Sequence, residues 1–422
     1  MVLFISTNDD LGGAAVVTMR LAMALRRRGI DARMLVGHKR SGYAWVDTLS
    51  SWRVAAAKVA ERAQIFAHNG LTRRDLWKVS TGSFGAGVCS HPWVEDADMI
   101  VLGWVSQGVV SLSDLRRLCA MRKPLVWWMH DLWCATGICH IPTSAREGSD
   151  AIFGCERFRE GCGDCPYLHW ERRKADLSRR IWERKLGLFQ TLPIHFWCVS
   201  NWQKEVCLSS SLLRGKRLEV LHHAFPIEDY AFSESVSSDS ANKKLIVMGA
   251  ARLDDPVKGL SMAIEALNLL ITKHPEIADA AEAIFFGGLR DAGAIAGLKM
   301  SHRYVGPLAD SDLQKLYRRA DVVLSASLFE TMGATLMEGM ACGATPVTFG
   351  RGGQGDIVSH GADGYIADYG SADSMADYLY KALTEPFDRQ AQHASVAARF
   401  AGDRIAERFC RLTKQTCGID LI

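Results

Sequence analysis

Short apolar runs alternate with amphipathic segments along the whole chain. Most runs end in glycine or small polar residues, a pattern typical of buried strands in a parallel sheet. Helical spacing of apolar residues follows several runs, as in residues 16–29. The apolar runs are residues 1–6, 31–36, 99–102, 124–129, 194–199, 220–221, 244–249, 283–288, 320–325 and 344–348. The repeated order of strand, glycine corner, helix and strand predicts an α/β chain with doubly wound, Rossmann-like sheets.

A polar segment separates two halves of this pattern. Residues 233–244 (SESVSSDSANKK) lack periodicity, which is typical of a linker. The expected parts are an N-terminal domain (1–215) with a cysteine-rich insertion (134–166), a C-terminal domain (240–395) and a closing segment (396–422). Amphipathic spacing predicts a last helix at 399–414, and its return to the N-terminal domain is one interpretation.

Length and composition describe a multidomain protein with no general preference for a partner. At 422 residues the chain is too long for one ordinary core. The net charge of +3 says little about partners, and no nucleic-acid partner is expected. No apolar run reaches the roughly 18 residues of a spanning helix, and the first residues, MVLFISTNDD, lack the basic leader of a signal peptide. A cytoplasmic location is therefore expected.

Residues 51–80 are amphipathic and basic, with Trp52 and Trp77 among arginines and lysines. Such a segment lies on an anionic membrane surface in some proteins and covers its own domain in others. Both interpretations remain open. The first would make the protein peripheral at the inner face of the cell membrane.

The stretch FETMGATLMEGMACG, residues 329–343, joins a strand to a helix. Glu330 stands at the strand end, and the Gly-Ala-Thr corner at 333–335 opens the helix. Free N–H groups and the positive end of the helix dipole suit an anion there. Glu338 lies about one and a half turns into the helix. Residues 350–355 (GRGGQG), which come after the next strand, are expected to form a flexible loop.

Two cations follow the strand at 244–249. Arg252 and Lys258 flank a loop at its carboxyl end, where a guanidinium fork and an ammonium suit a diphosphate. Solvated surface cations are the alternative. A glycine pair, Gly12 and Gly13, follows the first strand of the chain and indicates either a tight turn or a ligand close to the backbone.

His130 and Asp131 follow the strand at 124–129. A histidine at the carboxyl end of a strand projects into the crevice at the edge of a doubly wound sheet, which favours a role in a site. The alternative is a core histidine that bonds to the backbone.

The cysteine-rich insertion holds two spaced pairs of thiols. Cys162 and Cys165 are separated by two residues, and Cys139 and Cys155 form a wider pair. An aperiodic loop of about 35 residues is too long to stay ordered without help, and four thiolates would satisfy a structural, tetrahedral zinc ion. Free thiols in a packed loop are the alternative.

Together these residues resemble the pattern of glycosyltransferase family 4 on the GT-B fold. The residues that carry the resemblance are Gly12, Gly13, His130, Arg252, Lys258, Glu330 and Glu338. The segment HDLWCATGICH, followed by GCGDCP, further resembles the colanic-acid-type exopolysaccharide branch of that family. The resemblance covers nearly the whole chain and implies two Rossmann-like domains that face each other across a cleft. The chain departs from the usual E-S-F-G motif at Thr331 and Met332.

The resemblance implies a role for each of these residues. Arg252 and Lys258 would hold the nucleotide diphosphate, and Glu338 would bind the ribose hydroxyls. Glu330 would contact hydroxyls of the donor sugar, with His130 beside that sugar at the reaction centre. The backbone of the corner would bind sugar and phosphates, and the glycine pair would let phosphates approach. The corner is Gly333, Ala334 and Thr335, and the pair is Gly12 and Gly13.

The activity implied is transfer of a sugar from a nucleotide-sugar donor to a hydroxyl, with the anomeric configuration retained. No Asp-x-Asp metal clamp is evident, so the cations and the helix start are expected to meet the charge of the leaving diphosphate without a catalytic metal. The acceptor implied is a glycan of surface or exopolysaccharide synthesis, on a polyprenyl carrier if the chain contacts the membrane. A nucleotide-sugar epimerase and a non-catalytic scaffold that binds nucleotide sugar are the rival functions.

Overall fold

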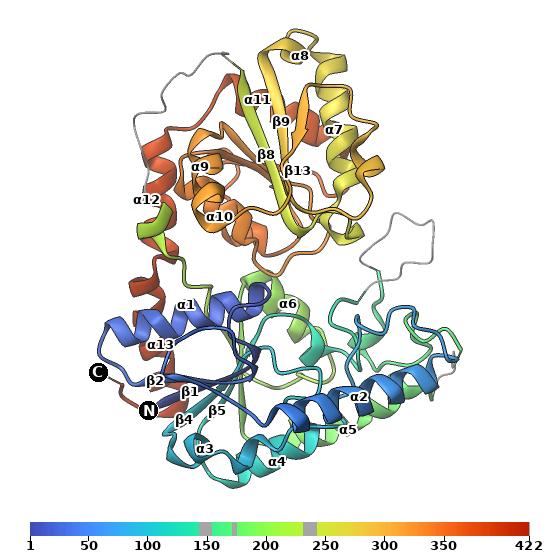
Figure 1. Cartoon of the computed structure of the whole chain (residues 1–422), viewed down its shortest axis with the longest axis vertical. Coiled ribbons are helices and arrows are strands. Elements are labelled where there is room, and N and C mark those ends of the chain that lie inside the picture. Colours follow the sequence, from blue (N-terminus) through green and yellow to red (C-terminus); the bar gives the residue numbers. More distant parts are fainter. Residues whose placement is uncertain (143–153, 171–174, 231–242, 422) are drawn as a thin grey trace. The chain divides into compact units, whose positions relative to one another are not determined.

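The computed structural model divides the chain into two compact α/β units (Figure 1). The first comprises Met1–Ala224 and Gly402–Ile422, and the second comprises Phe225–Ala401. The residues described are 1–142, 154–170, 175–230 and 243–421. Most of the predicted linker and part of the cysteine-rich insertion, at 231–242 and 143–153, lie outside the described residues.

The first unit is built on a sheet whose strands run parallel throughout the described residues. From edge to edge they are β3 (Val46–Thr48), β2 (Ala32–His38), β1 (Val2–Asn8), β4 (Met99–Leu102), β5 (Leu125–Met129), β6 (Ile194–Cys198) and β7 (Leu218–Val220). The register sets Phe4 opposite Met34 on one side and Val101 on the other. All three side chains are fully buried, as expected for a parallel sheet that is covered on both faces.

Helices cover both faces of this sheet (Figure 1). One face carries α1 (Gly13–Arg27) and α13 (Gly402–Cys417), and the other carries α2 (Ser51–His68), α4 (Leu112–Ala120) and α5 (Leu177–Thr191). The shorter helices α3 (Pro92–Asp96) and α6 (Asn201–Leu208) lead into β4 and β7. Although α13 ends the chain, it packs in the first unit. The centroid of its Phe409 ring lies 5.9 Å from that of Phe4 and 5.5 Å from that of Trp197.

The second unit repeats this plan with another sheet that is parallel in the described residues. Its strands are β10 (His302–Tyr304), β9 (Ala281–Gly288), β8 (Lys244–Arg252), β11 (Val322–Ser325), β12 (Thr345–Phe349) and β13 (Tyr365–Ala367), from edge to edge. One face carries α7 (Leu260–Lys273), α8 (Ile277–Ala280) and α11 (Ala372–Thr384), and the other carries α9 (Asp310–Arg319), α10 (Ala334–Ala341) and α12 (Arg389–Phe400) (Figure 1).

Both sheets reverse their strand order beside their first strand, which confirms the predicted doubly wound α/β class. β1 lies between β2 and β4, and β8 lies between β9 and β11. Loops that leave the carboxyl ends of strands on either side of such a reversal turn toward opposite faces of the sheet. Ligands of open α/β sheets bind at this place.

The prediction of a flexible loop at 350–355 was wrong. These residues enter a buried turn, in which Gln354 is fully buried and its Nε2 donates to Ser327 O at 3.3 Å and to Thr348 Oγ1 at 3.1 Å. A Cβ at Gly353 would stand 2.0 Å from Thr331 O. The glycines therefore permit close backbone packing, not mobility.

The predicted helix at 399–414 is interrupted at its start. α12 ends at Phe400, Ala401 has the extended ψ of 142°, and α13 begins at Gly402. Phe400 O accepts a hydrogen bond from Phe225 N at 2.8 Å, so the end of α12 is tied to the beginning of the second unit. The break is the point where the chain leaves the second unit and returns to the first.

Because Phe409 is fully buried, we expect Phe409→Ala to lower the free energy of unfolding by about 3–5 kcal/mol through the cavity it leaves. Urea unfolding of the whole chain measures this. Arg411→Ala, on the same helix with a side chain 65% exposed, is the control and is expected to change stability by less than about 0.5 kcal/mol. Equal losses in the two variants would show that α13 is not part of the core.

Candidate active site

The loop after β8 is held against the end of β11 in the second unit. Val257 O accepts a hydrogen bond from Leu328 N at 2.8 Å. Gly259 has a φ of 66°, and a Cβ there would stand 1.9 Å from Ala326 O. A side chain at this position would therefore push the two strand ends apart. The contact fixes the place of Lys258, the neighbour of this glycine.

Lys258 and Glu330 form an ion pair across the same junction. Nζ lies 2.7 Å from Oε2, and the side chains are 28% and 21% exposed. Burial opposes the charge of Lys258, but the Glu330 carboxylate outweighs burial and raises the pKa of the ammonium. Because the Glu330 carboxylate is partly solvated, Lys258 can leave it and bind the anion of a ligand instead.

Arg252 lies at the end of β8 and pairs with Asp254. Nε and Nη2 each lie 3.3 Å from a carboxylate oxygen, and the hydrogen bond from Arg252 lowers the pKa of Asp254. An ion pair this exposed contributes little to stability, so the guanidinium can turn to another anion at small cost. The structure thus places both predicted cations on one loop of the second unit.

The predicted glycine corner is the start of α10. Gly333 has a φ of 103°, a conformation that other residues rarely adopt, and Cγ of Glu330 lies 3.5 Å from the position of a Cβ there. Ala334 and Thr335 are next, and the first N–H groups of a helix have no partner within the helix. The corner therefore sets hydrogen-bond donors and the positive end of a helix dipole beside Glu330.

Glu338 lies further along α10 and is 8% exposed. It faces Tyr317 of α9, where burial first and the Glu338 carboxylate second raise the pKa of the phenol well above its usual value. Only a small part of the Glu338 carboxyl group is open to a ligand. A contact with a ribose stays a prediction.

The glycine pair of the first unit opens α1. Gly12 has a φ of 92° and caps the helix, whereas a Cβ at Gly12 or Gly13 would meet no atom within 4 Å. The backbone angle alone requires glycine at the first position, as in a tight turn. Gly13 leaves open space above the first turn of α1, and the approach of a phosphate to it stays a prediction.

His130 follows β5 and takes part in a hydrogen-bonded group of the first unit. Its Nε2 lies 3.3 Å from Thr18 Oγ1, and its Nδ1 lies 3.4 Å from His223 Nε2. Burial lowers the pKa of His130 to about 4, although the charge of Asp131 opposes this. At neutral pH the imidazole is therefore uncharged, which disfavours it as a general acid.

Asp131 is held by three donors. Its carboxylate accepts from Trp104 Nε1 at 2.8 Å, from Trp133 N at 2.8 Å and from His140 Nδ1 at 2.6 Å. Burial raises the pKa of Asp131, but the interaction with His140 and these hydrogen bonds lower it overall. This carboxylate anchors the segment that enters the cysteine-rich insertion.

Sequence reasoning missed Thr18 and His223 as partners of His130, and His140 as a partner of Asp131. His223 carries a usable signal, since it follows β7 of the same sheet just as His130 follows β5. Thr18 lies inside α1, and His140 follows an irregular segment, so no spacing rule predicts their contacts.

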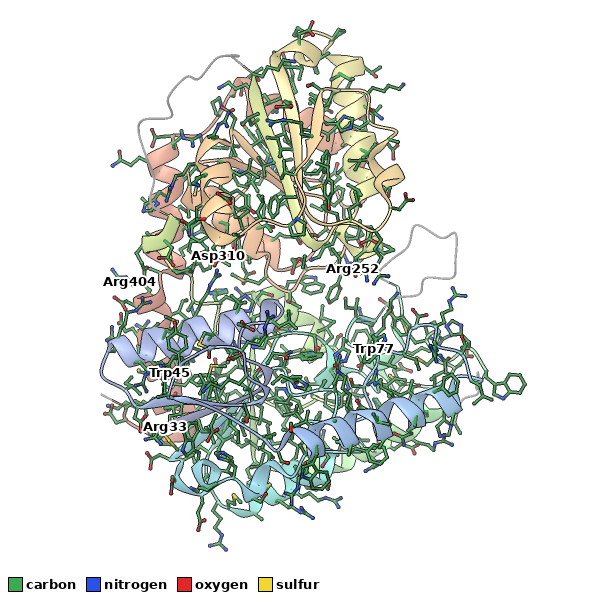
Figure 2. All side chains as sticks on the ribbon, in the orientation of Figure 1. Arg33, Trp45, Trp77, Arg252, Asp310 and Arg404 are labelled. Carbon is green, nitrogen blue, oxygen red and sulfur yellow. The ribbon has the colours of Figure 1, made fainter. Side chains whose placement is uncertain are left out.

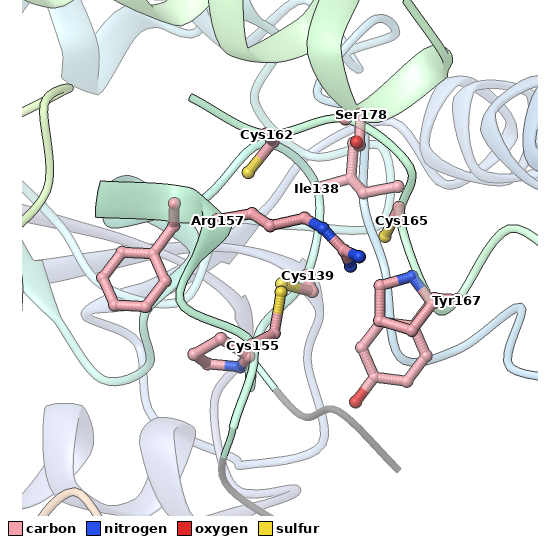
Figure 3. A pocket seen from close by; sticks show the side chains of 12 residues that line it. Ile138, Cys139, Cys155, Arg157, Cys162, Cys165, Tyr167 and Ser178 are labelled. Atoms are coloured by element: carbon pink, nitrogen blue, oxygen red, sulfur yellow. The ribbon is translucent and has the colours of Figure 1, made fainter. Parts of the chain in front are cut away.

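The four predicted zinc ligands line one small cavity in the first unit (Figure 3). They are Cys139, Cys155, Cys162 and Cys165, and the cavity has a volume of about 10 Å³. Burial raises the pKa of three of these thiols, to about 11 for Cys162, and the neighbouring sulfurs add to the shift. Among the described residues no group of three or more donors is arranged as a metal centre. The structure thus gathers the cysteines without setting them in coordination geometry.

Comparison with known proteins finds a family similarity in the second unit. Residues 232–399 match the model of the family glycosyl transferases group 1. Mannosylfructose-phosphate synthase of Agrobacterium fabrum is 25% identical over an alignment that covers 58% of this chain and 58% of that protein. The chain therefore spans little more than half of this curated relative.

Solved structures of similar fold cover the chain almost completely. Anabaena HepE, crystallised with UDP-glucose, matches with a TM-score of 0.61 at 16% identity, over 98% of this chain and 99% of its own. Sucrose-phosphate synthase of Thermosynechococcus elongatus matches with a TM-score of 0.65 at 15% identity, over 99% of both chains. At such low identity these likenesses establish the fold, which is GT-B. Within it, residues 232–399 match the model of the glycosyl transferases group 1 family.

Proposed function

We propose that the chain is a retaining glycosyltransferase that moves a sugar from a nucleotide-sugar donor to a hydroxyl of a glycan acceptor. The observation that carries this proposal is the Lys258–Glu330 ion pair beside the start of α10, within the segment that matches the family. A cation, a carboxylate and free helix N–H groups adjoin one another at one strand end. A diphosphate joined to a sugar offers the complementary anion and hydroxyls.

Donor binding begins, in this proposal, with an exchange of partners. The diphosphate takes the ammonium of Lys258 from Glu330 and the guanidinium of Arg252 from Asp254. Glu330, released from its ion pair, accepts hydrogen bonds from hydroxyls of the donor sugar. The backbone at Gly333 supports the phosphates, and UDP-sugars are the first candidates because HepE was crystallised with UDP-glucose.

Transfer then breaks the bond between the anomeric carbon and the phosphate oxygen. The electron pair of that bond goes to the leaving diphosphate, whose growing charge is met by Lys258, Arg252 and the helix start. The acceptor oxygen attacks the anomeric carbon on the face that the diphosphate leaves, and its proton passes to a phosphate oxygen. These cations and the α10 dipole supply the charge stabilisation, so the proposed route needs no metal ion. The configuration at the anomeric carbon is retained.

The first unit contributes the acceptor side in this proposal. Gly13 gives phosphates room above the first turn of α1, and His130 borders the donor sugar as a neutral imidazole. Glu338 holds the ribose through the exposed edge of its carboxylate. A nucleotide-sugar epimerase would convert its donor without any acceptor, and a scaffold would bind the donor without converting it. Incubation with donor alone and with donor plus acceptor separates the three functions.

We further propose that the acceptor is carried on a membrane lipid, which the exposed surface around α2 supports. Apolar side chains there face solvent, with exposures of 80% for Trp170, 68% for Trp52 and 59% for Trp77. Trp170 packs beside Gly70, just after α2, and Trp77 lies beside α2 under the cations of Lys58 and Arg62 (Figure 2). Tryptophans among basic residues suit the interface of an anionic bilayer. Among the described residues no helix is long and apolar enough to cross a membrane.

A structural zinc ion is the last part of the proposal. Four thiols around a cavity of about 10 Å³ match zinc in number and in kind of donor. Rotation of the cysteine side chains toward the cavity would close the site, and zinc would turn the thiols into thiolates. The ion would link Cys155, Cys162 and Cys165 to Cys139. Cys139 is next to His140, which holds Asp131.

Lys258→Ala is expected to lower turnover by on the order of 10²–10³-fold, because it removes charge stabilisation from the leaving diphosphate. UDP-glucose and GDP-mannose are screened first for a rise in melting temperature, since a ligand of the native state stabilises it. Transfer is then measured with the donor that binds. Lys315→Ala removes another ion-paired lysine of the second unit and is expected to keep full activity. Near-normal turnover of folded Lys258→Ala would remove the phosphate role.

The double variant Trp52→Ser, Trp170→Ser is expected to weaken binding to phosphatidylglycerol vesicles by at least tenfold, because two large apolar side chains leave the interface. Sedimentation with vesicles measures the bound fraction, and phosphatidylcholine vesicles report the electrostatic share. Leu208→Ser changes an exposed apolar residue of α6 and is the control. Equal binding by the double variant and the wild type contradicts the membrane surface.

Purified protein is expected to hold one zinc ion per chain by elemental analysis. Cys165→Ser should lose the ion and lower the melting temperature, because the insertion loses its cross-link. Cys417→Ser, which changes a half-buried thiol of α13, should keep both. Metal-free protein in which all thiols react with a thiol reagent would end the zinc proposal.

A further inference from the structure

We infer that His223 is a positioning residue, which acts with Thr18 to hold His130 as the neutral tautomer with its proton on Nε2. The inference concerns the internal order of the first unit. Its consequence for turnover rests on the proposed glycosyl transfer, while its structural content can be measured without any activity.

The three residues meet at the carboxyl edge of the first sheet. His130 follows β5, His223 follows β7, and Thr18 reaches them from α1. The Trp128 ring stands edge-on to both imidazoles, at 4.6 Å from His130 and 5.8 Å from His223 between centroids. A Cβ at Gly103 would come within 3.1 Å of Thr18 Oγ1. Glycine at the end of β4 therefore leaves the space in which Thr18 and His130 meet.

Both imidazoles are neutral near pH 7. Burial lowers the pKa of His130 to about 4. Burial, followed by His130, His222 and Arg20, lowers the pKa of His223 well below its usual value. Each ring then carries a single N–H, and one proton lies between Nδ1 of His130 and Nε2 of His223.

Thr18 decides which ring donates that proton. Its hydroxyl has one hydrogen, which it donates to Ala14 O at 2.7 Å within α1. Thr18 Oγ1 is therefore an acceptor toward Nε2 of His130, which must carry the hydrogen. His130 Nδ1 is then unprotonated and accepts from Nε2–H of His223. All three hydrogen bonds therefore point the same way: His223 donates to His130, His130 donates to Thr18, and Thr18 donates to the Ala14 carbonyl.

The far nitrogen of His223 supports the same direction. Among the described residues its Nδ1 is buried without a hydrogen-bond partner. In the inferred arrangement this atom is a bare acceptor. In the opposite arrangement it would be a buried N–H donor without a partner, a state that native proteins tolerate less often. Thr18 and His223 thus exclude the same tautomer independently.

The arrangement assigns His130 a role other than proton transfer. Both of its ring nitrogens are engaged within the first unit, and neither offers a titrating group at neutral pH. The His130 ring is instead held at both nitrogens and stays neutral and fixed in orientation. In the proposed reaction, this ring lies beside the donor sugar. His223 acts on turnover only through this fixed orientation.

Histidine-selective ¹⁵N labelling of the whole chain tests the tautomer directly. Long-range ¹H–¹⁵N correlation spectra at pH 7 separate protonated from bare ring nitrogens, and spectra of His130→Gln and His223→Gln assign the two rings. We expect a protonated Nε2 and a bare Nδ1 in both. A proton on Nδ1 of His130, or an imidazolium at either position, overturns the inference.

A matched pair of variants tests the positioning role. Glutamine at position 223 can place an amide N–H near the site of Nε2, whereas leucine cannot. We expect His223→Leu to lower kcat roughly tenfold, the usual effect of one lost hydrogen bond, with the KM for donor changed less than about twofold. His223→Gln should restore most of kcat. Equal kcat in the two variants contradicts a role for the hydrogen bond.

Thr18 supplies a second pair in case His223→Leu does not fold. Thr18→Ser keeps the acceptor for Nε2–H of His130 and Thr18→Val removes it, so only the valine variant should shift the Nε2 signal. An unchanged Nε2 signal in Thr18→Val overturns the inference. If the chain transfers no sugar, the kinetic comparison shows no turnover in any variant, while the spectra still decide the tautomer. Failure of the proposed function and failure of this inference are therefore distinguishable.

Discussion

The second unit depends on the close approach of two backbone segments at its strand-order reversal. Gly259, in the left-handed region, lies so near Ala326 O that a side chain would separate the end of β11 from the loop after β8. β8 and β11 are neighbouring parallel strands at the reversal, so their carboxyl ends lie side by side. This contact holds the backbones next to Lys258 and Glu330 together, and the two side chains form their ion pair beside it.

The energetics of the ion pair suit a site that must release what it holds. The side chains of Lys258 and Glu330 are 28% and 21% exposed, so solvent still reaches both charges. Hydrogen bonds between a cation and a phosphate contribute about 1.5–3 kcal/mol each. In the proposed function, a diphosphate can replace Glu330 at Lys258 because it offers more negative charge and more acceptor oxygens than one carboxylate. In the proposed function, the carboxylate freed in this way accepts hydrogen bonds from the hydroxyls of a sugar.

Much of this fold could be predicted from the sequence, because the pattern of strand, glycine corner and helix depends on residues that are close together in the chain. The apolar run at 99–102 matches β4, and the corner at Gly333 is the start of α10. Lys258 and Glu330 each follow a strand in the sequence, but only the structure shows that these strands, β8 and β11, are neighbours and share one edge. What spacing could not show is long-range packing. Gln354 is buried and donates to Ser327 O, 27 positions away, and to Thr348 Oγ1, whereas the glycines around it look like a loop in the sequence.

The same limit explains why the sequence indicated His130 but not the residues that bond to it. A histidine after a strand could be found, but its partners lie 112 positions away in the chain, at Thr18, and 93 positions away, at His223. The tautomer depends on a hydroxyl already committed to a helix carbonyl, a fact that no motif encodes. The two units thus use opposite chemistry. In the second, charges are held loosely enough to be exchanged, which is what binding and expelling a diphosphate requires. In the first, neutral groups are held in a fixed order, because a ring that exchanged partners would lose the orientation that the proposed function requires of it.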